Sequence, residues 1–149
     1  MDGKEFFSRL ALAVYKIDGA YDVFARSGNV KANLMWLLYA LNDGRRHTQC
    51  GICSEWLFPR TTVNTLVKEC KERGFIELKK IAGERREMEI ALTEEGKRYA
   101  DKVLSPVYEA EKALFQEYFR ERGFGFLEEL ESFGEALEKS FLVACSEEK

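Results

Sequence analysis

The chain has 149 residues, of which 46% are hydrophobic and 33% charged, and its formal net charge is −3. This composition is typical of a folded globular protein and argues against an intrinsically disordered one. The longest apolar run, residues 34–41, is far shorter than the roughly 18 residues of a membrane-spanning helix, and the amphipathic N-terminal segment is unlike a signal peptide, so we expect a cytoplasmic protein without a membrane partner.

Two helices are predicted in the first part of the chain. Residues 4–26 carry apolar side chains three and four positions apart, which is the period of a long amphipathic helix. The Ser-Gly-Asn sequence at 27–29 interrupts this pattern. Residues 30–41 are apolar almost all round, which predicts a second helix that is central and buried.

A pair of shorter helices follows the polar turn after residue 41. Thr48 is a suitable N-cap for a helix over residues 48–56, although Gly51 weakens that helix. Pro59 fits the first turn of the next helix, where a backbone N–H has no intrahelical partner. Apolar side chains then recur at helical spacing and predict a buried stripe of Val63, Leu66, Val67 and Cys70.

A hairpin and two long helices complete the predicted elements. Residues 75–81 and 87–92 alternate or nearly alternate between apolar and polar side chains, which predicts a two-stranded hairpin. Thr93 is the expected N-cap of a helix that extends to about residue 122, and Pro106 should kink or break it. Glycines at 123 and 125 precede a last amphipathic helix over residues 127–143.

Charge is distributed unevenly along the chain. Residues 45–86 contain ten Lys and Arg and five Asp and Glu, a net charge of +5. The remaining residues contain thirteen Lys and Arg and twenty-one Asp and Glu, a net charge of −8. A basic middle between acidic flanks favours a local surface that binds phosphate.

The fourth predicted helix carries side chains suited to a DNA groove. If its apolar stripe points inward, its outward face carries arginine, which can bridge guanine, asparagine, which can pair with adenine, and threonine, which can meet a phosphate or a thymine methyl. The N-terminus of the preceding helix, at Thr48, would lie near a phosphate. The hairpin tip carries Arg85 and Arg86, which suit a neighbouring minor groove. This order of elements is that of a winged helix. The outward-facing residues are Arg60, Thr61, Asn64, Thr65 and Lys68.

Three longer stretches resemble the MarR (multiple-antibiotic-resistance regulator) family. "AVYKIDGAYDVFARSGNVKANLMWLLYAL" is similar to its first two helices, and "PRTTVNTLVKECKERGFIE" to its recognition helix and the strand that follows. "ERREMEIALTEEGKRYADKV" resembles its wing and the start of the next helix. The last stretch contains the recurring pattern of an acid, an arginine and Leu-Thr-x-x-Gly, here Glu84, Arg86, Leu92, Thr93 and Gly96.

The resemblance implies a fold and a function. The fold would be α+β and mainly helical, a single domain over residues 1–149. A winged helix-turn-helix lobe would occupy residues 30–92, and long dimerisation helices residues 1–29 and 93–149. The chain would be a homodimeric regulator, a repressor in most family members, that binds a palindromic operator in double-stranded DNA and is released by a small-molecule effector.

The DNA-contacting residues would lie on the recognition helix, at the start of the helix before it, and in the wing. The wing acid is usually Asp in the family, so Glu84 is a departure, and the wing is short. The candidates are Thr48, Arg60, Thr61, Thr62, Asn64, Thr65, Lys68, Arg85 and Arg86.

Cysteine and histidine leave a metal- or thiol-gated alternative open. His47, Cys50 and Cys53 have the spacing H-x2-C-x2-C, but zinc prefers four ligands, and free thiols are the default for a chain of this kind. Cys50 is the best candidate for a reactive thiol, because it should be exposed near a helix start and near Arg45 and Arg46. The peroxide-sensing members use a cysteine in the first helix, and this chain has none there.

Two further interpretations concern ligands and chemistry. Aromatic side chains of the predicted helices could line an effector pocket, although core or dimer-interface roles are commoner for such residues. We expect no cofactor and no enzymatic activity, because no catalytic constellation of side chains is present. A winged helix that contacts only protein is a further alternative. The pocket candidates are Tyr15, Tyr21, Trp36 and Tyr39.

Overall fold

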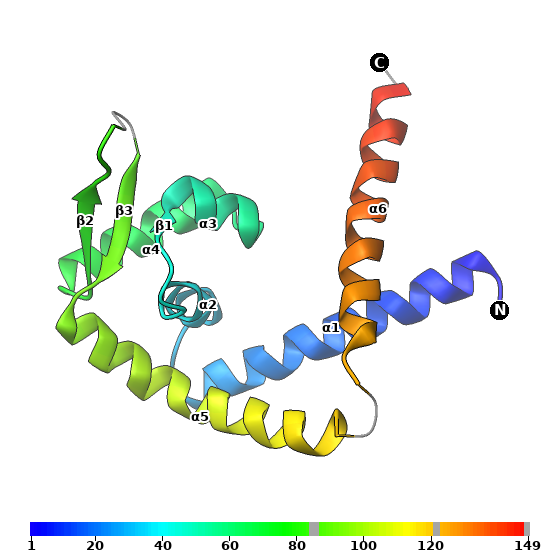
Figure 1. Cartoon of the computed structure of the whole chain (residues 1–149), viewed down its shortest axis with the longest axis horizontal. Coiled ribbons are helices and arrows are strands. Elements are labelled where there is room, and N and C mark those ends of the chain that lie inside the picture. Colours follow the sequence, from blue (N-terminus) through cyan, green and yellow to red (C-terminus); the bar gives the residue numbers. More distant parts are fainter. Residues whose placement is uncertain (84–86, 121–122, 148–149) are drawn as a thin grey trace. The chain divides into compact units, whose positions relative to one another are not determined.

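A computed structural model describes residues 1–83, 87–120 and 123–147 (Figure 1). The chain forms two compact units, Met1–Tyr108 and Glu109–Lys149. No helix in the described ranges is both long enough and apolar enough to cross a membrane. The expected Glu84, Arg85 and Arg86 lie outside the described residues.

The first unit contains the first four predicted helices and the start of the fifth, in the predicted order. Helix α1 matches its prediction to within a residue at each end, whereas α2 begins later than expected, because Lys31 is its extended N-cap. Pro59 is the N-cap of α4 and not part of its first turn. The helices are α1 (Gly3–Ser27), α2 (Ala32–Leu41), α3 (Gln49–Glu55), α4 (Arg60–Glu72) and α5 (Glu94–Tyr118), which continues into the second unit.

The sheet has three antiparallel strands in the order β1-β3-β2. The predicted hairpin is confirmed as β2 (Ile76–Lys80) and β3 (Met88–Leu92), with Leu78 opposite Ile90. Strand β1 (His47–Thr48) was not predicted, and it pairs with β3 through His47 opposite Ile90. Two residues are too few to show alternation, so only the tertiary contact with β3 defines this strand.

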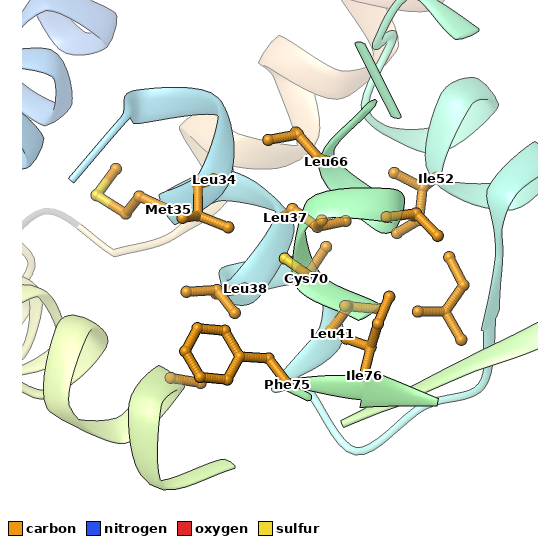
Figure 2. Close-up of a cluster of buried hydrophobic side chains, with 14 of the residues drawn as sticks. Leu34, Met35, Leu37, Leu38, Leu41, Ile52, Leu66, Cys70, Phe75 and Ile76 are labelled. Atoms are coloured by element: carbon orange, nitrogen blue, oxygen red, sulfur yellow. The ribbon is translucent and has the colours of Figure 1, made fainter. Parts of the chain in front are cut away.

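One hydrophobic core joins α2, α4 and the sheet (Figure 2). Helix α2 is the centre, as its apolar sequence predicted, and Met35, Leu37 and Leu38 are fully buried. The predicted stripe of α4, which includes Cys70, is buried against it. Because this stripe is directed inward, the opposite face of α4 is left to solvent.

A close junction fixes the start of α5 against the end of α4. Gly74 has a φ of +73°, and the Thr93 hydroxyl donates to the Gly74 carbonyl at 2.6 Å. The Gly96 N–H donates to Thr93 Oγ1 at 3.0 Å, so Thr93 also caps the helix as predicted. The Phe75 and Tyr99 rings stack at 4.3 Å. The Leu-Thr-x-x-Gly pattern therefore joins the end of α4, the sheet and α5.

The C-terminal helices differ from their predictions in extent. Helix α5 continues through Pro106 without a break and ends at Tyr118, before the expected residue 122. Pro106 is exposed, so water can bind the carbonyl that loses its intrahelical N–H partner. Helix α6 (Gly125–Glu147) is longer than predicted at both ends. In the second unit, the Phe119 ring packs against those of Phe124 and Phe126, with ring centroids 6.1 and 5.5 Å apart.

Candidate nucleic-acid interface

A groove of about 590 Å³ lies between α3, α4 and the hairpin. Its walls combine the start of α3, the N-terminal half of α4 and side chains from both hairpin strands or their ends. The lining residues are Thr48, Gln49, Cys50, Cys53, Arg60, Asn64, Leu78, Glu87 and Met88.

Two of the predicted recognition residues line this groove from α4. Arg60 and Asn64 are exposed and one helical turn apart, so their side chains lie on the same face. Lys68 is the next residue in this row, and its ammonium is 3.9 Å from Glu72 in an exposed pair. Such a pair is weak in water, so the Lys68 charge remains accessible to a phosphate. We define Arg60, Asn64 and Lys68 as the α4 row.

The threonines of α4 lie elsewhere. Thr61, Thr62 and Thr65 line a separate depression of about 680 Å³, which is shared with α1 and α2. Thr62 is half-buried, and the Thr65 hydroxyl donates to the Thr61 carbonyl at 2.9 Å. Arg60 and Asn64 thus line the same groove as Thr48, whereas the three threonines line a neighbouring depression.

Thr48 acts first as a helix cap. Its Oγ1 accepts from the Gly51 N–H at 3.0 Å, which confirms the predicted N-cap of α3. Thr48 also pairs with Glu89 in the short β1–β3 ladder. The start of α3 is therefore held at the edge of the groove by both a cap and a strand.

Several lining residues are not predicted from the sequence. Gln49 follows the cap of α3, whereas Leu78, Glu87 and Met88 come from the hairpin. No local pattern distinguishes them, because they join the groove only when the hairpin folds back beside α4. Glu87 is an acid at the groove edge, and it would oppose a phosphate placed next to it.

The two arginines before β1 lie beside carboxylates. Arg45 pairs with Asp43 and lies 3.7 Å from Glu55, and Arg46 lies 3.8 Å from Glu89. His47 is buried, and its Nε2 lies 2.8 Å from an Asp43 carboxylate oxygen. Loss of water around Asp43 acts to raise the pKa of its carboxyl, but hydrogen bonds from His47 and from the Arg45 backbone and side chain outweigh this effect and hold that pKa well below its ordinary value.

We expect Asp43→Asn to destabilise the protein at neutral pH. The lowered pKa of Asp43 means that the folded state favours the carboxylate, so its contribution is present above the ordinary aspartate pKa of about 3.9 and is lost as the pH falls below that value. Urea unfolding of both proteins between pH 3 and pH 7 measures this directly. The difference in unfolding free energy should shrink toward pH 3; a constant difference would show that the charge of Asp43 is not involved.

The histidine and cysteines of the alternative metal site have separate surroundings. Among the described residues, no group of three His, Cys, Asp or Glu side chains is placed to hold a metal ion. His47 is directed to Asp43, Cys50 is exposed, and Cys53 is half-buried. The cysteines are free thiols, and Cys50 and Cys53 both line the groove.

Cys70 is expected to resist alkylation in the folded protein. It is buried, and this burial raises the pKa of its thiol, which disfavours the reactive thiolate. Timed labelling with iodoacetamide and peptide mass spectrometry should show early modification of the exposed Cys50 and modification of Cys70 only after denaturation. Equal labelling rates for the two residues in the native protein would contradict the buried position of Cys70.

The aromatic pocket candidates are only partly brought together. The Trp36 ring centroid lies 4.5 Å from that of Tyr21 and 5.5 Å from that of Tyr39. The Trp56 ring centroid lies 5.8 Å from that of Trp36. Tyr15 is 74% exposed on α1 and lies outside this cluster. Three of the four predicted residues thus share one cluster. Trp56 belongs to the same cluster and was not predicted.

Comparisons with solved structures identify the fold. A MarR family regulator from Neisseria meningitidis matches over 100% of both chains, with 25% identity and a TM-score of 0.74. The structure of S. aureus MepR in its DNA-binding conformation matches over 89% of this chain and 98% of the MepR chain, with 17% identity and a TM-score of 0.73.

A third match adds a structure that contains DNA. It is a MarR family regulator from Listeria monocytogenes complexed with a 26mer DNA, at 15% identity, 91% of both chains and a TM-score of 0.65. No protein-family model and no curated protein sequence matches the chain. The solved structures confirm the resemblance to the MarR family and the mainly helical α+β fold with a winged-helix lobe.

Proposed function

We propose that this chain is a DNA-binding transcriptional regulator that acts as a homodimer and represses transcription from a palindromic operator. The observation that carries the proposal is the α4 row: Arg60 and Asn64 line a groove on the exposed face of the helix that a winged helix places in the major groove of DNA. Arginine and asparagine are the side chains that read guanine and adenine through paired hydrogen bonds.

The homodimer is supported by apolar side chains that one chain leaves exposed. Phe7, Leu12 and Ile17 on α1 are 47–61% exposed, and Phe141 and Leu142 on α6 are 62% and 61% exposed. A second copy of the chain would cover such surfaces. Two copies would present two α4 rows, which explains the choice of a palindromic operator. The assignment of residues 1–29 and 93–149 as dimerisation helices belongs to this proposal, as do a cytoplasmic location and release by an effector.

Selection from a random duplex library, followed by titration of the selected sequence at two salt concentrations, tests the proposal. We expect a palindrome that binds two chains, with an affinity that falls steeply as salt increases, because bound phosphates release counterions. If no motif is recovered, and binding is weak at both salt concentrations, the DNA-binding proposal is wrong, and a winged helix that contacts protein becomes the better interpretation.

A thiol-gated version of this function is favoured by one observation, the presence of Cys50 in the groove. An oxidised or modified thiol at this position would add bulk beside Arg60 and Asn64. We therefore expect peroxide treatment to weaken operator binding and Cys50→Ser to abolish the effect. Equal binding by oxidised and reduced wild-type protein would exclude thiol gating while leaving DNA binding intact.

A further inference from the structure

The groove beside α4 contains a group of sulfur-bearing side chains. Three of its nine described lining residues carry sulfur, namely Cys50, Cys53 and Met88. The chain has only four cysteines and three methionines in 149 residues, so composition alone does not account for three of them in one groove. Cys70 and Met35, by contrast, are buried in the hydrophobic core, where sulfur side chains pack as apolar groups.

The two cysteines of the groove lie on one face of α3. They are three residues apart in the helix, a spacing that places their Cβ atoms about 5–6 Å apart. Cys50 is exposed, Cys53 is half-buried, and both are free thiols. A disulfide needs Cβ atoms about 3.5–4.5 Å apart. In a regular helix, this pair therefore suits an atom that bridges the two sulfurs better than a direct bond between them.

The sheet brings Met88 to the same groove. Met88 begins β3, and the next residue, Glu89, pairs with Thr48, which is the N-cap of α3. Helix α3 and β3 are also in direct contact. The Met88 side chain is 38% exposed, so it is not enclosed in the core. Its unbranched thioether chain has three rotatable bonds, which let the sulfur adjust to an occupant of the groove.

We propose that Cys50, Cys53 and Met88 form a binding site for monovalent copper. Soft thiolate and thioether sulfurs are the ligands that select Cu(I). Zinc prefers four ligands drawn from thiolate, imidazole and carboxylate groups, and magnesium and calcium take oxygen ligands. On binding, Cu(I) bonds to the two cysteine sulfurs, whose protons pass to solvent, and to the neutral Met88 sulfur. No electron is transferred.

Bound copper would change the charge of the groove. Two thiolates and one Cu(I) together carry a net negative charge, and they share the groove with Arg60 and Asn64. This charge opposes an incoming phosphate and competes with DNA for the Arg60 guanidinium. We therefore expect copper to weaken operator binding. This regulatory role rests on the proposed function, whereas copper binding itself does not.

Titration of the full-length, reduced protein with Cu(I) under anaerobic conditions tests the site. Bicinchoninate is the competing chromophoric chelator, and ascorbate keeps the copper monovalent. We expect a single tightly bound Cu(I) per chain, which an equal concentration of Zn²⁺ does not displace. X-ray absorption at the copper edge should show sulfur neighbours only. Displacement by zinc, or nitrogen and oxygen neighbours in place of sulfur, would overturn the proposal.

Sulfur-removing variants locate the site. Met88→Leu removes the thioether with little change of volume, and Cys50→Ser combined with Cys53→Ser removes both thiols. Loss of a metal ligand should weaken binding at least as much as loss of an outer-shell partner does, roughly 10–100-fold. Cys145→Ser is the control, because it removes an exposed thiol of α6 outside the groove lining, and it should keep the wild-type affinity.

Thermal unfolding confirms that each variant is folded. Unchanged Cu(I) affinity in Met88→Leu, or in the double cysteine variant, would overturn the three-sulfur site. The methionine also separates this site from thiol oxidation, because oxidation of Cys50 does not require a thioether.

Operator binding with and without saturating Cu(I) separates copper binding from its effect on DNA. A copper-dependent loss of affinity in the wild type that is reduced in Met88→Leu would assign the effect to this site. Copper binding without any change in operator affinity would remove the regulatory role only. If no operator is recovered, the proposed function fails, and the result of the copper titration still stands.

Discussion

Replacing Gly96 with alanine is expected to unfold or strongly destabilise the winged-helix lobe. A Cβ atom at Gly96 would lie 1.8 Å from the Phe75 carbonyl oxygen and 2.7 Å from its carbonyl carbon. Both neighbours are backbone atoms, so no side chain can rotate away. The Phe75 carbonyl also accepts from the Thr93 N–H at 3.0 Å, and the clash would break this bond.

The direction of the change in unfolding free energy tests the close contact, because alanine favours helices and would otherwise stabilise the protein. In a free helical position the same substitution would stabilise the protein by up to about 1 kcal/mol, whereas overpacking of this kind costs about 3 kcal/mol or more. Urea unfolding followed by circular dichroism measures the difference.

Gly19→Ala is the matched control, because nothing lies within 4 Å of a Cβ atom added to that α1 residue. It should be neutral or stabilising. A Gly96→Ala protein as stable as the wild type would show that α5 and the Phe75 backbone do not meet as closely as the structure indicates.

Removing either groove-lining member of the α4 row is expected to abolish most sequence-specific binding. Arg60→Ala and Asn64→Ala each delete a side chain that can make two hydrogen bonds to one base, an interaction worth about 1–3 kcal/mol of discrimination. This energy corresponds to a roughly tenfold to hundredfold increase in Kd for the selected operator. Because both residues are exposed on the solvent face of α4, the unfolding free energy should change little.

Comparing the affinities of each variant for operators with single base changes identifies the bases that its side chain contacts. Binding of each variant to operators with single base changes should show relaxed preference at one position in each half-site, whereas Lys68→Ala should weaken all sequences alike and reduce the salt dependence. Lys71→Ala is the charge-matched control, since it lies on α4 outside the groove lining. If Lys71→Ala costs as much affinity as Arg60→Ala, the groove is not the recognition surface.

The sequence by itself determined most elements of this protein, although not the short strand β1, and much of their orientation. Apolar spacing located the helices of the lobe, because a buried helix face must repeat with the helical period. The inward position of Cys70 and the outward positions of Arg60 and Asn64 follow from the same stripe on α4. The caps at Thr48 and Thr93 are local interactions between a side chain and a nearby N–H, so sequence alone indicated both.

Only the tertiary structure decided which of these side chains share a surface. Asn64 lines the groove beside the hairpin and Thr65 the depression beside α1, and these neighbours of α4 leave no periodic signal in the sequence. The pairing of His47 with Asp43, a part-buried hydrogen bond, likewise depends on the packed structure and is not indicated by the H-x2-C-x2-C spacing. The need for glycine at 96 arises from the Phe75 carbonyl, 21 residues earlier in the chain. Periodicity reports which way a side chain faces relative to its own element, whereas partners distant in sequence are fixed by how the elements pack together.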